Sequence, residues 1–489
     1  MKGYYEKKAK EYQIAYHDRM GKELFNNGKG TKLEKNTSSD HATTNSSSFE
    51  GAIPDAIEYN ALVALYNATQ GENWLYKDRW LEDTNFQNWY GVFVVNGDVE
   101  GIYLDDNNLI GNLPPEIGDL TGLKILGLRG NLISGLPSEI SSLINIEELV
   151  IDQNQLTSLP AQIGSLEKLW LFSLTQNQLT SLPSQIGDLE ALSTLNLNSN
   201  QLTSLPPQIG NLTNLQFLSV VDNQLSNLTV DIGRLSSLKN LIVAYNQLQT
   251  LPIQIGDLGS LDELNISDNL ITSLPNEIER LDNLRSLFVG RNRITSIYPE
   301  LDGLAKLDRV FATANNIDLN DFAQYFTDEN QSRFSIFEYR PQNEFGEAQS
   351  ITGYLGENLN LLSFFNNHPQ TTFQWQRRVN DTWVDIDEAT QETYTFVNVS
   401  TNDAGDYRCK ATNAWARITQ FSAPVTLEVS GELNPQTQAL HDFVNSMANV
   451  TNLPPSWDLA NPIDTWEGVT VVNGNVTEII LEDKDVAGT

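Results

Sequence analysis

An asparagine that recurs at a fixed interval is the feature that most constrains the fold of this chain. It stands in the pattern L-x-x-L-x-L-x-x-N-x-L, and the first interval is 24 residues while the other eight are 23. The ten positions are Asn107, Asn131, Asn154, Asn177, Asn200, Asn223, Asn246, Asn269, Asn292 and Asn315. Self-similarity at such a period is the signature of stacked structural units, so the chain is expected to form a solenoid.

Each repeat predicts one short strand followed by a turn. In "LSTLNLNSNQLTSLPPQIGNL" the leucines alternate around the strand, and the later apolar residues return to the same interior. The apolar positions of this copy are Leu195, Leu197, Leu202, Leu205, Ile209 and Leu212. Asn200 stands where the chain leaves the strand, so its carboxamide is expected to bond backbone groups of neighbouring coils. The repeated asparagines therefore predict a ladder along the solenoid.

The second half of each repeat carries a proline and a glycine. Pro206 fixes its own φ and disfavours helix at Leu205, which predicts an extended step after the strand. Gly210 then marks the side opposite the strand. One such unit cannot bury its own leucines, whereas stacking seals them between coils.

These repeats resemble the leucine-rich-repeat family. The resemblance implies an α/β fold in which a right-handed curved solenoid carries a parallel sheet on its concave face. With strands about 4.8 Å apart, ten repeats would give a sheet roughly 45 Å long. We expect the repeats to span residues 97–321.

Both ends of a solenoid need a cap. Residues 51–96 combine Ala61, Leu62, Leu65 and Tyr66 at helical spacing with three tryptophans, Trp74, Trp80 and Trp89. This segment resembles the N-terminal cap of plant-type repeat receptors, whose Trp-x-Gly-Val motif matches Trp89, Gly91 and Val92, although the usual cysteine pair is absent. Residues 322–345 are expected to close the other end with the aromatic residues Phe322, Tyr325, Phe326, Phe334, Phe337 and Tyr339.

The period stops near Gly346, and short alternating strands take over. The string "DAGDYRCKATN" resembles the F strand of immunoglobulin-like sandwiches, with Tyr407 two residues before Cys409. Family spacing puts the core tryptophan at Trp375 and a serine, Ser363, where the partner cysteine would stand. We expect an all-β Ig-like domain over residues 346–430, with Cys409 a buried free thiol; another small β-sandwich is the alternative.

The last segment repeats the start of the solenoid. "WEGVTVVNGNVTEIILEDKDVAGT" aligns without gaps on "WYGVFVVNGDVEGIYLDDNNLIGN". Residues 431–489 are therefore expected to form a second repeat cap and a first strand, and we expect the chain to be a fragment of a longer bacterial multidomain protein.

The net charge of the chain disfavours two classes of binding partner. The 63 acidic and 30 basic residues give a formal net charge of −33, which repels nucleic-acid backbones and anionic lipid surfaces. Residues 1–50 hold a charged arm and a Ser/Thr/Asn-rich linker, without the apolar run of a signal peptide. No run of 18 apolar residues occurs, so we expect no membrane insertion and no nucleic-acid partner.

No catalytic or metal-binding pattern was found in the sequence. The four histidines are spaced unlike metal ligands, and the P-loop, G-x-G-x-x-G, G-x-S-x-G and H-E-x-x-H motifs are missing. We expect no enzymatic activity, no metal and no cofactor.

The concave face remains as the candidate site, because residues between the inward leucines point outward. Apolar anchors beside polar or acidic groups are typical of a protein-binding face. The candidates for ligand binding are Tyr103, Asp105, Val150, Asp152, Leu171, Phe217, Val221, Ile242, Phe288 and Phe311. The alternative is that a sheet this long exposes a few apolar side chains by chance, without any role in binding.

The sequence predicts a recognition or adhesion protein that binds a protein, or else a polysaccharide, without catalysis. Resemblance favours a location at the cell surface or outside the cell, and the cytoplasm is the alternative. Two other readings stay open: a sensor portion of a larger signalling protein or enzyme whose effector domain lies beyond Thr489, and an intracellular scaffold. Repeats and sandwiches each host many functions, so the fold alone names no ligand.

Overall fold

The structure is a computed structural model of the 489-residue chain. It describes residues 56–297, 301, 303–317, 334–339, 342, 344, 346–363, 365, 371–413 and 418–432, four single positions between 435 and 442, and the backbone of 469–472 and 475–479. The expected arm at 1–50 lies outside the described residues.

A helix and an aromatic cluster cover the first coil. Helix α2 (Ala56–Ala68) buries Ala61, Leu62 and Leu65, as its spacing predicts. Beside it, the Trp74 and Trp80 ring centroids lie 4.9 Å apart and those of Trp80 and Trp89 lie 4.7 Å apart. Two short 3-10 helices, η1 (Gly71–Asn73) and η2 (Phe86–Asn88), belong to the same segment. These residues shield the first leucines from water, which is what an end cap must do.

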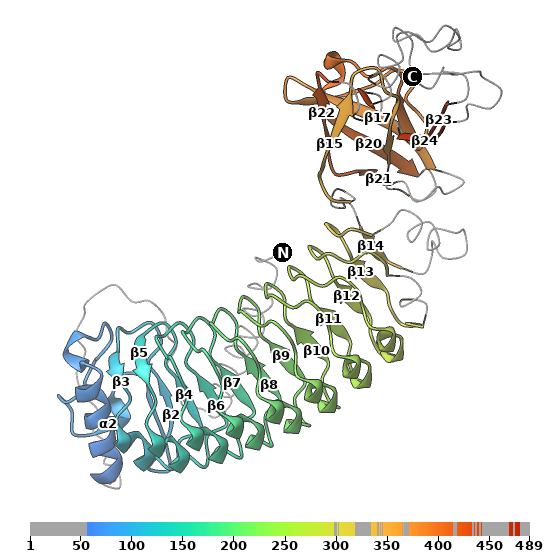
Figure 1. Cartoon of the computed structure of the whole chain (residues 1–489). Helices are drawn as coiled ribbons and strands as arrows, with labels where there is room; N and C mark the ends of the chain where they lie inside the picture. Colours follow the sequence, from blue (N-terminus) through green and yellow to red (C-terminus); the bar gives the residue numbers. More distant parts are fainter. Residues whose placement is uncertain are drawn as a thin grey trace, which may run out of the picture. The chain divides into compact units, whose positions relative to one another are not determined.

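A 12-stranded sheet runs along the solenoid (Figure 1). β1 pairs antiparallel with β2, and every later strand pairs parallel with its neighbour in chain order. The sheet contains β1 (Val92–Val95), β2 (Asp98–Tyr103), β4 (Ile125–Gly127), β6 (Glu148–Val150), β7 (Leu171–Ser173), β8 (Thr194–Asn196), β9 (Phe217–Ser219), β10 (Asn240–Ile242), β11 (Glu263–Asn265), β12 (Ser286–Phe288), β13 (Arg309–Phe311) and β14 (Ile336–Glu338). Two further strands, β3 (Ile110–Asn112) and β5 (Leu132–Gly135), pair with each other.

Short 3-10 helices lie opposite the strands, along the outer side of the solenoid (Figure 1). They are η3 (Pro115–Asp119), η4 (Ser138–Ser142), η5 (Ala161–Ser165), η6 (Ser184–Asp188), η7 (Pro207–Asn211), η8 (Val230–Arg234), η9 (Ile253–Asp257) and η10 (Asn276–Arg280). Pro206 is extended, with φ −66° and ψ 146°, as the Leu-Pro pair predicts. A Cβ on Gly210 would lie 2.4 Å from the backbone oxygen of Asp231, so the glycine is needed where adjacent coils approach.

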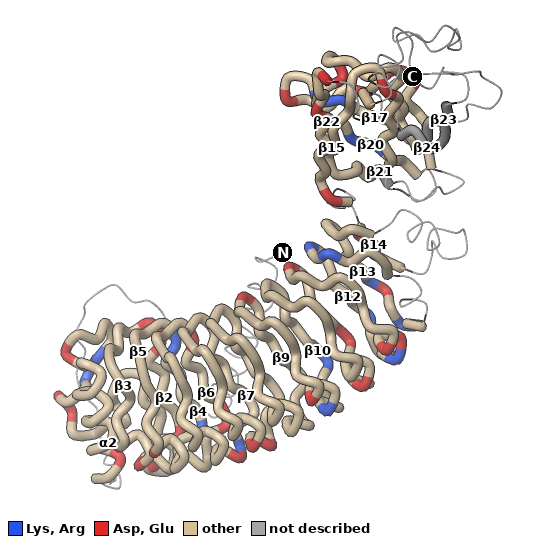
Figure 2. Tube along the Cα trace, viewed as in Figure 1, with Lys and Arg blue, Asp and Glu red and all other residues tan. Residues whose placement is uncertain are grey.

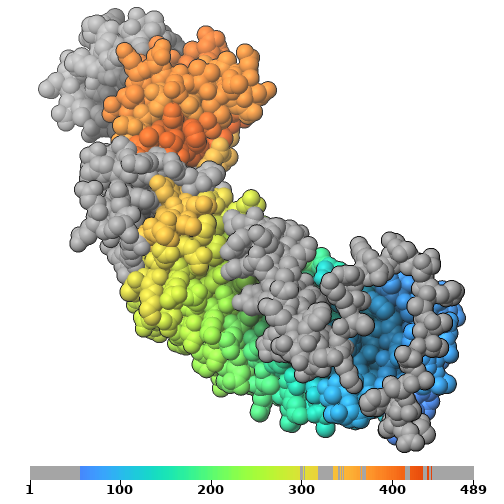
Figure 3. All heavy atoms as spheres, turned by 180° about the vertical axis from the view of Figure 1, so that it is seen from behind, coloured from blue at the N-terminus to red at the C-terminus, as the bar shows by residue number. Residues whose placement is uncertain are grey.

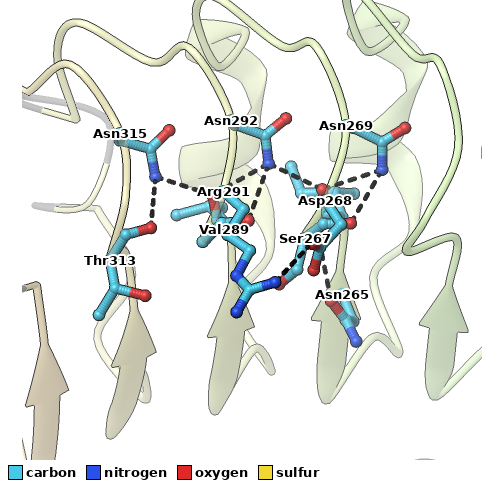
Figure 4. Close-up of polar contacts among 11 residues, drawn as sticks. Asn265, Ser267, Asp268, Asn269, Val289, Arg291, Asn292, Thr313 and Asn315 are labelled. Carbon is cyan, nitrogen blue, oxygen red and sulfur yellow. Dashed lines mark hydrogen bonds and ion pairs between the residues drawn. The ribbon is translucent and has the colours of Figure 1, made fainter. Parts of the chain in front are cut away.

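The predicted asparagine ladder is confirmed. Asn223 Nδ2 donates to Leu197 O at 2.9 Å, and its Oδ1 accepts from Leu202 N at 2.9 Å, so one carboxamide holds two points of the preceding coil. Figure 4 shows three successive members, Asn269, Asn292 and Asn315, at the same level of their coils. We call the ten asparagines of the repeat the asparagine ladder.

The residue before each ladder asparagine has a left-handed backbone. Gln176, Tyr245 and Arg291 have φ of 57°, 55° and 55° respectively. This conformation turns the chain out of the strand, and most of the side chains that adopt it are not glycine. The sequence pattern gave no hint of it.

The solenoid extends one coil past the ten predicted repeats. β14 adds to β13 inside the segment expected only as a closing cap. Gln342 takes the place of a ladder asparagine there, since its Nε2 donates to Ala312 O at 2.8 Å and its Oε1 accepts from Asn315 N at 3.2 Å. The ring of Phe337 contacts those of Phe334 and Tyr339, whereas Phe322, Tyr325 and Phe326 lie outside the described residues.

The next domain is an all-β sandwich. One sheet has the order β15-β22-β20-β17-β18, with β21 also paired to β20, and the other pairs β16 with β19. Its elements are β15 (Gln349–Tyr354), β16 (Leu359–Leu362), β17 (Thr371–Val379), β18 (Thr382–Asp385), β19 (Thr393–Phe396), the 3-10 helix η11 (Thr401–Asp403), β20 (Gly405–Asn413), β21 (Ile418–Phe421) and β22 (Val425–Ser430).

The sandwich core follows the predicted motif. Trp375 and Cys409 are 0% exposed and face each other in the β17–β20 register. Tyr407 donates its hydroxyl to Asp403 O at 2.6 Å, which is a tyrosine corner. Farther along, the backbones of β23 (Val469–Val472) and β24 (Asn475–Ile479) pair as an antiparallel hairpin, with the same register shift as β1 and β2.

Candidate functional site

The candidate site is the concave face of the solenoid, formed by the outward residues of β2, β4 and β6–β13. Their parallel registers align the residues in straight rows, and the central row runs Tyr103, Gly127, Val150, Ser173, Asn196, Ser219, Ile242, Asn265, Phe288 and Phe311. In Figure 2 these strands are mostly tan, and charged residues gather mainly toward the edges of the coils. Figure 3 shows the molecule from behind, with the coils in sequence from blue to yellow.

The ten predicted residues fall into three separate groups. Tyr103 and Asp105 lie at the β2 end, where the Tyr103 ring meets that of Phe93 at a centroid distance of 5.1 Å. Val150, Asp152 and Leu171 belong to the coils of β6 and β7, and Val150 and Leu171 are half-buried. The other five residues lie between β9 and β13.

Phe288 and Phe311 form a stacked aromatic pair on the face. The two residues are direct partners in the β12–β13 register. Their ring centroids lie 4.5 Å apart with an interplanar angle of 3°. The expectation that they lie side by side is confirmed, and Phe311 is the more exposed of the two.

A second apolar group joins β9 and β10. Ser219 lies between Phe217 and Val221 on one coil and pairs in register with Ile242 on the next. Phe217, Val221 and Ile242 expose 9%, 9% and 3% of their surface and Phe288 exposes 5%, so these four side chains lie nearly level with the face, whereas Phe311 is half-buried.

Asp152 is held by the neighbouring coil. It is 1% exposed, and its Oδ1 accepts from Ser173 Oγ at 2.6 Å and from Thr175 N at 2.7 Å. Burial raises the pKa of Asp152 to about 6, and the two hydrogen bonds oppose that rise. Asp105 is bonded in the same way, since its Oδ1 accepts from Arg129 N at 2.8 Å.

Two coils later, Asn198 accepts the hydrogen bonds that correspond to those of Asp152. Asn198 Oδ1 accepts from Ser219 Oγ at 2.7 Å and from Val221 N at 2.8 Å. Both residues therefore tie consecutive coils together on the concave face. Asp105 and Asp152, expected from the sequence to bind a ligand, accept hydrogen bonds from the neighbouring coil, a structural contribution that the sequence pattern did not indicate.

Four polar residues beside the phenylalanine pair were not predicted as site residues. Glu263, Asn265, Ser267 and Ser286 expose 3%, 0%, 1% and 0% of their surface. Glu263 pairs in register with Ser286, and Asn265 pairs with Phe288. Reading the outward rows for buried polar residues next to aromatic ones would have found them.

An ion pair lies at the edge of this region. Arg291 Nη1 lies 3.4 Å from Asp268 Oδ1, and Figure 4 shows the pair below the asparagine ladder. Burial raises the pKa of Asp268, and the nearby Arg291 guanidinium opposes that shift.

Three further observations concern metal binding, thiol reactivity and membrane-spanning helices. Among the residues described, no group of three or more His, Cys, Asp and Glu side chains is arranged to hold a metal ion. Burial raises the pKa of the Cys409 thiol to about 12, and the thiol is free and fully covered. None of the helices in the described part of the chain has the length and hydropathy to cross a membrane.

Family models match three segments of the chain. Residues 162–241 match the model described as leucine-rich repeat region, and residues 259–317 match leucine rich repeat. Residues 349–419 match immunoglobulin domain. No match was found among curated proteins.

Several solved structures are similar to parts of the chain. A leucine-rich-repeat protein of Leptospira interrogans is 30% identical, with a TM-score of 0.34, over 48% of this chain and 71% of its own. The ectodomain of the Arabidopsis thaliana receptor kinase GASSHO1/SCHENGEN3, in complex with CASPARIAN STRIP INTEGRITY FACTOR 2, is 21% identical over 60% of this chain and 44% of its own, with a TM-score of 0.43. A TLR13–ssRNA13 complex is 26% identical over 42% and 31%, with a TM-score of 0.39. The chain thus spans less than half the length of the last two.

Proposed function

We propose that this chain, which contains leucine-rich repeats and an immunoglobulin domain, is a non-catalytic recognition protein that binds a protein ligand on the concave face of its solenoid. The stacked Phe288–Phe311 pair is the observation that carries the proposal. Aromatic side chains dominate the energy of protein interfaces, and this pair lies in the outward row of a rigid sheet.

Rigidity supports this function. The asparagine ladder and the coil-to-coil bonds of Asp152 and Asn198 fix the backbone beneath the face. A surface that is already ordered loses little conformational entropy when a partner binds. A modest apolar area on the concave face can therefore be enough to bind a partner.

The described residues give little support to a catalytic role. A cysteine nucleophile reacts as its thiolate and must be reachable, whereas Cys409 is buried with its pKa raised to about 12. We infer that Cys409 packs the sandwich core and that recognition is the activity of the chain. The combination of repeats with an immunoglobulin domain favours a location at the cell surface or outside the cell.

A comparison of the two sides of the solenoid tests the proposal. Partners captured by the full chain would be identified by mass spectrometry, purified, and titrated against variants by calorimetry. We expect Phe288→Ala to weaken the affinity at least about tenfold, as truncation of a central aromatic residue does.

The outer side supplies matched controls. Val230 and Ile253 are 57% and 56% exposed, on η8 and η9. Val230→Ala and Ile253→Ala should leave the affinity unchanged. If these two variants abolish binding while Phe288→Ala does not, the proposal is wrong.

A further inference from the structure

Four aromatic side chains reach the surface where the N-terminal cap meets the concave face. The Tyr76 and Tyr90 rings stack with their centroids 5.5 Å apart, and the Phe93 and Tyr103 rings meet edge to face with their centroids 5.1 Å apart. Tyr76 and Phe93 are 49% and 37% exposed, whereas Tyr90 and Tyr103 are half-buried. We call these four residues the cap aromatic surface.

The Asp105 carboxylate lies beside both aromatic pairs. A Cβ on Gly127 would lie 3.4 Å from Asp105 Oδ1 and 3.5 Å from Tyr103 Cδ1, so the carboxylate and the tyrosine ring flank the same glycine. Burial raises the pKa of the Tyr90 hydroxyl, and the carboxylates of Asp105 and Asp78 add to that rise. The surroundings of the rings are therefore acidic.

A second copy of the cap hairpin in the same chain forms without these rings. The β23–β24 hairpin has the pairing register of β1–β2, including the shift within the first strand. The two sequences share the tryptophan, glycine and valine of the Trp-x-Gly-Val motif but differ at the aromatic positions. Glu467, Thr470 and Ile480 stand where the first copy has Tyr90, Phe93 and Tyr103. The hairpin backbone does not require the three rings, so their presence in the first copy calls for another explanation.

The two ends of the solenoid differ in charge. Residues 56–145, which form the cap and the first two coils, contain twelve acidic and four basic residues. Residues 284–333, which carry β12 and β13, contain seven acidic and six basic residues. Because complementary charge selects partners, a basic group is favoured at the cap end much more than at the end that carries Phe288 and Phe311.

The basic residues of the cap end do not offset its acidity. Lys124 Nζ lies 2.9 Å from Glu100 Oε1, and Lys77 Nζ donates to the backbone oxygen of Glu72. Arg129 occupies a position that holds an aspartate on each of the two flanking coils. A cation from a partner therefore meets more carboxylates than ammonium or guanidinium groups here.

We propose that the cap aromatic surface binds arginine or lysine side chains of the protein ligand, as a second contact area at the cap end of the concave face. A cation within about 6 Å of a ring centroid is attracted by the negative face of the ring. The acidic residues around the rings add a favourable field. This inference rests on the proposed function and adds to it the chemistry of the partner, which presents a basic segment to the cap end.

A matched pair of peptides tests the inference on the full chain. One is a short fluorescent peptide that alternates arginine with serine, and the other replaces each arginine by citrulline, which keeps the shape of the side chain and removes its charge. The titrations are followed by fluorescence anisotropy at about 0.15 M ionic strength, where the field of distant charges is screened. We expect the arginine peptide to bind and the citrulline peptide to bind at least about tenfold more weakly.

Two substitutions at position 93 separate a contact with the ring from general attraction to an acidic chain. Phe93→Leu keeps an apolar side chain and should weaken the arginine peptide about two- to fivefold, the effect of one exposed cation–π contact. Phe93→Trp restores a ring and should bind the peptide at least as tightly as the wild type. Val230→Ala, on the outer side, is the control and should leave the peptide affinity unchanged. Thermal denaturation should show both position 93 variants folded, because Phe93 lies at the surface.

Several results would overturn the inference. They are equal binding of the two peptides, no binding of the arginine peptide, or equal affinity of Phe93→Leu and the wild type. A photoreactive residue at position 93 that crosslinks only to residues 1–50 of the same chain would also overturn it, because the occupant would then be the basic arm. If Phe288→Ala weakens binding of the captured protein partner while Phe93→Leu binds that partner like the wild type, the inference fails and the proposed function stands.

Discussion

The asparagine ladder and the concave face are built from the same repeat, yet they use it in opposite ways. Each of the ten repeats places an asparagine at the ladder position, and Asn200, Asn223 and Asn246 make the same bonds to the preceding coil. The concave positions change from coil to coil, and one such position holds Asp152, Asn198 and Ser267 in different repeats. Uniform positions hold the stack together, and variable positions are free to carry recognition.

The difference separates two kinds of polar group. Ladder asparagines satisfy both their donors and their acceptor within the chain, so removing one leaves buried backbone groups unpaired. Ser267 and Ser286, on the concave side of the coils, have buried hydroxyls without a hydrogen-bond partner among the described residues. Truncation should therefore destabilise the first kind and spare the second.

The largest effect is expected in the ladder. Asn223→Ala leaves Leu202 N and Leu197 O without their partner, and it should lower the free energy of unfolding by about 3–5 kcal/mol. Urea denaturation followed by circular dichroism measures the change. Asn214→Ala is the control, because the Asn214 side chain is exposed and its Nδ2 donates to Glu190 O, and the substitution should cost less than about 1 kcal/mol. Equal losses of unfolding free energy in the two variants would show that a ladder asparagine stabilises the chain no more than an exposed asparagine does.

Replacing Asp152 should give the next largest change in stability, and this change should be a stabilisation, unlike that of Asn223→Ala. The pKa of Asp152, raised by burial to about 6, means that the folded chain binds a proton more tightly than the unfolded chain, whose aspartate has a pKa near 4. Its contribution to stability is fully present below about pH 4 and is lost as the pH rises through about 6.

Replacing Asp152 by the residue found at the equivalent position two coils later should remove this dependence. Asp152→Asn keeps the acceptor for Ser173 and should stabilise the chain at pH 7.5 by about 2–3 kcal/mol, with no gain at pH 4. Urea denaturation at both pH values measures this. The reciprocal variant Asn198→Asp should introduce the same pH dependence. A stability difference that does not change with pH would refute the assignment.

Two serines of the concave face allow a satisfied hydroxyl to be compared with an unsatisfied one. Ser173→Ala removes a donor to the buried Asp152 carboxylate and should cost about 1–2 kcal/mol. Ser286→Ala should cost nothing or stabilise slightly, because its hydroxyl is unpartnered among the described residues. Thermal denaturation of the two variants decides the matter, and the reverse order would contradict the distinction between satisfied and unsatisfied hydroxyls.

The smallest effect concerns the left-handed residue before each ladder asparagine. Gln176 has φ 57°, so Gln176→Gly should relieve strain and stabilise the chain by about 0.5–1 kcal/mol. Gln178→Gly is the control at an equally exposed site without positive φ, and it should destabilise by a similar amount. Equal destabilisation by both would remove the strain argument.

Much of the fold could be predicted because the repeat encodes it directly. The leucine alternation, the Leu-Pro step and the ladder follow from residue type and spacing. The coil of β14 was missed because Gln342 stands 27 residues after Asn315, which breaks both the interval and the residue type. The left-handed turn was missed because residues as different as Gln176, Tyr245 and Arg291 adopt it.

The candidate site could be predicted only in part. Strand alternation placed Phe288 and Phe311 side by side correctly. It could not predict that the Asp152 carboxylate would accept hydrogen bonds from the next coil, because these bonds depend on the positions of Ser173 and Thr175 in that coil. Whether the buried polar atoms of Asn265 and Ser286 find hydrogen-bond partners likewise depends on side chains in neighbouring coils.

Site-specific photo-crosslinking of the full chain to its captured partner tests the central claim most directly. A photoreactive phenylalanine at position 311 samples the concave face, and one at position 253 samples the outer side. The proposed recognition surface predicts a crosslink from position 311 and none from position 253. A crosslink from position 253 alone would contradict it.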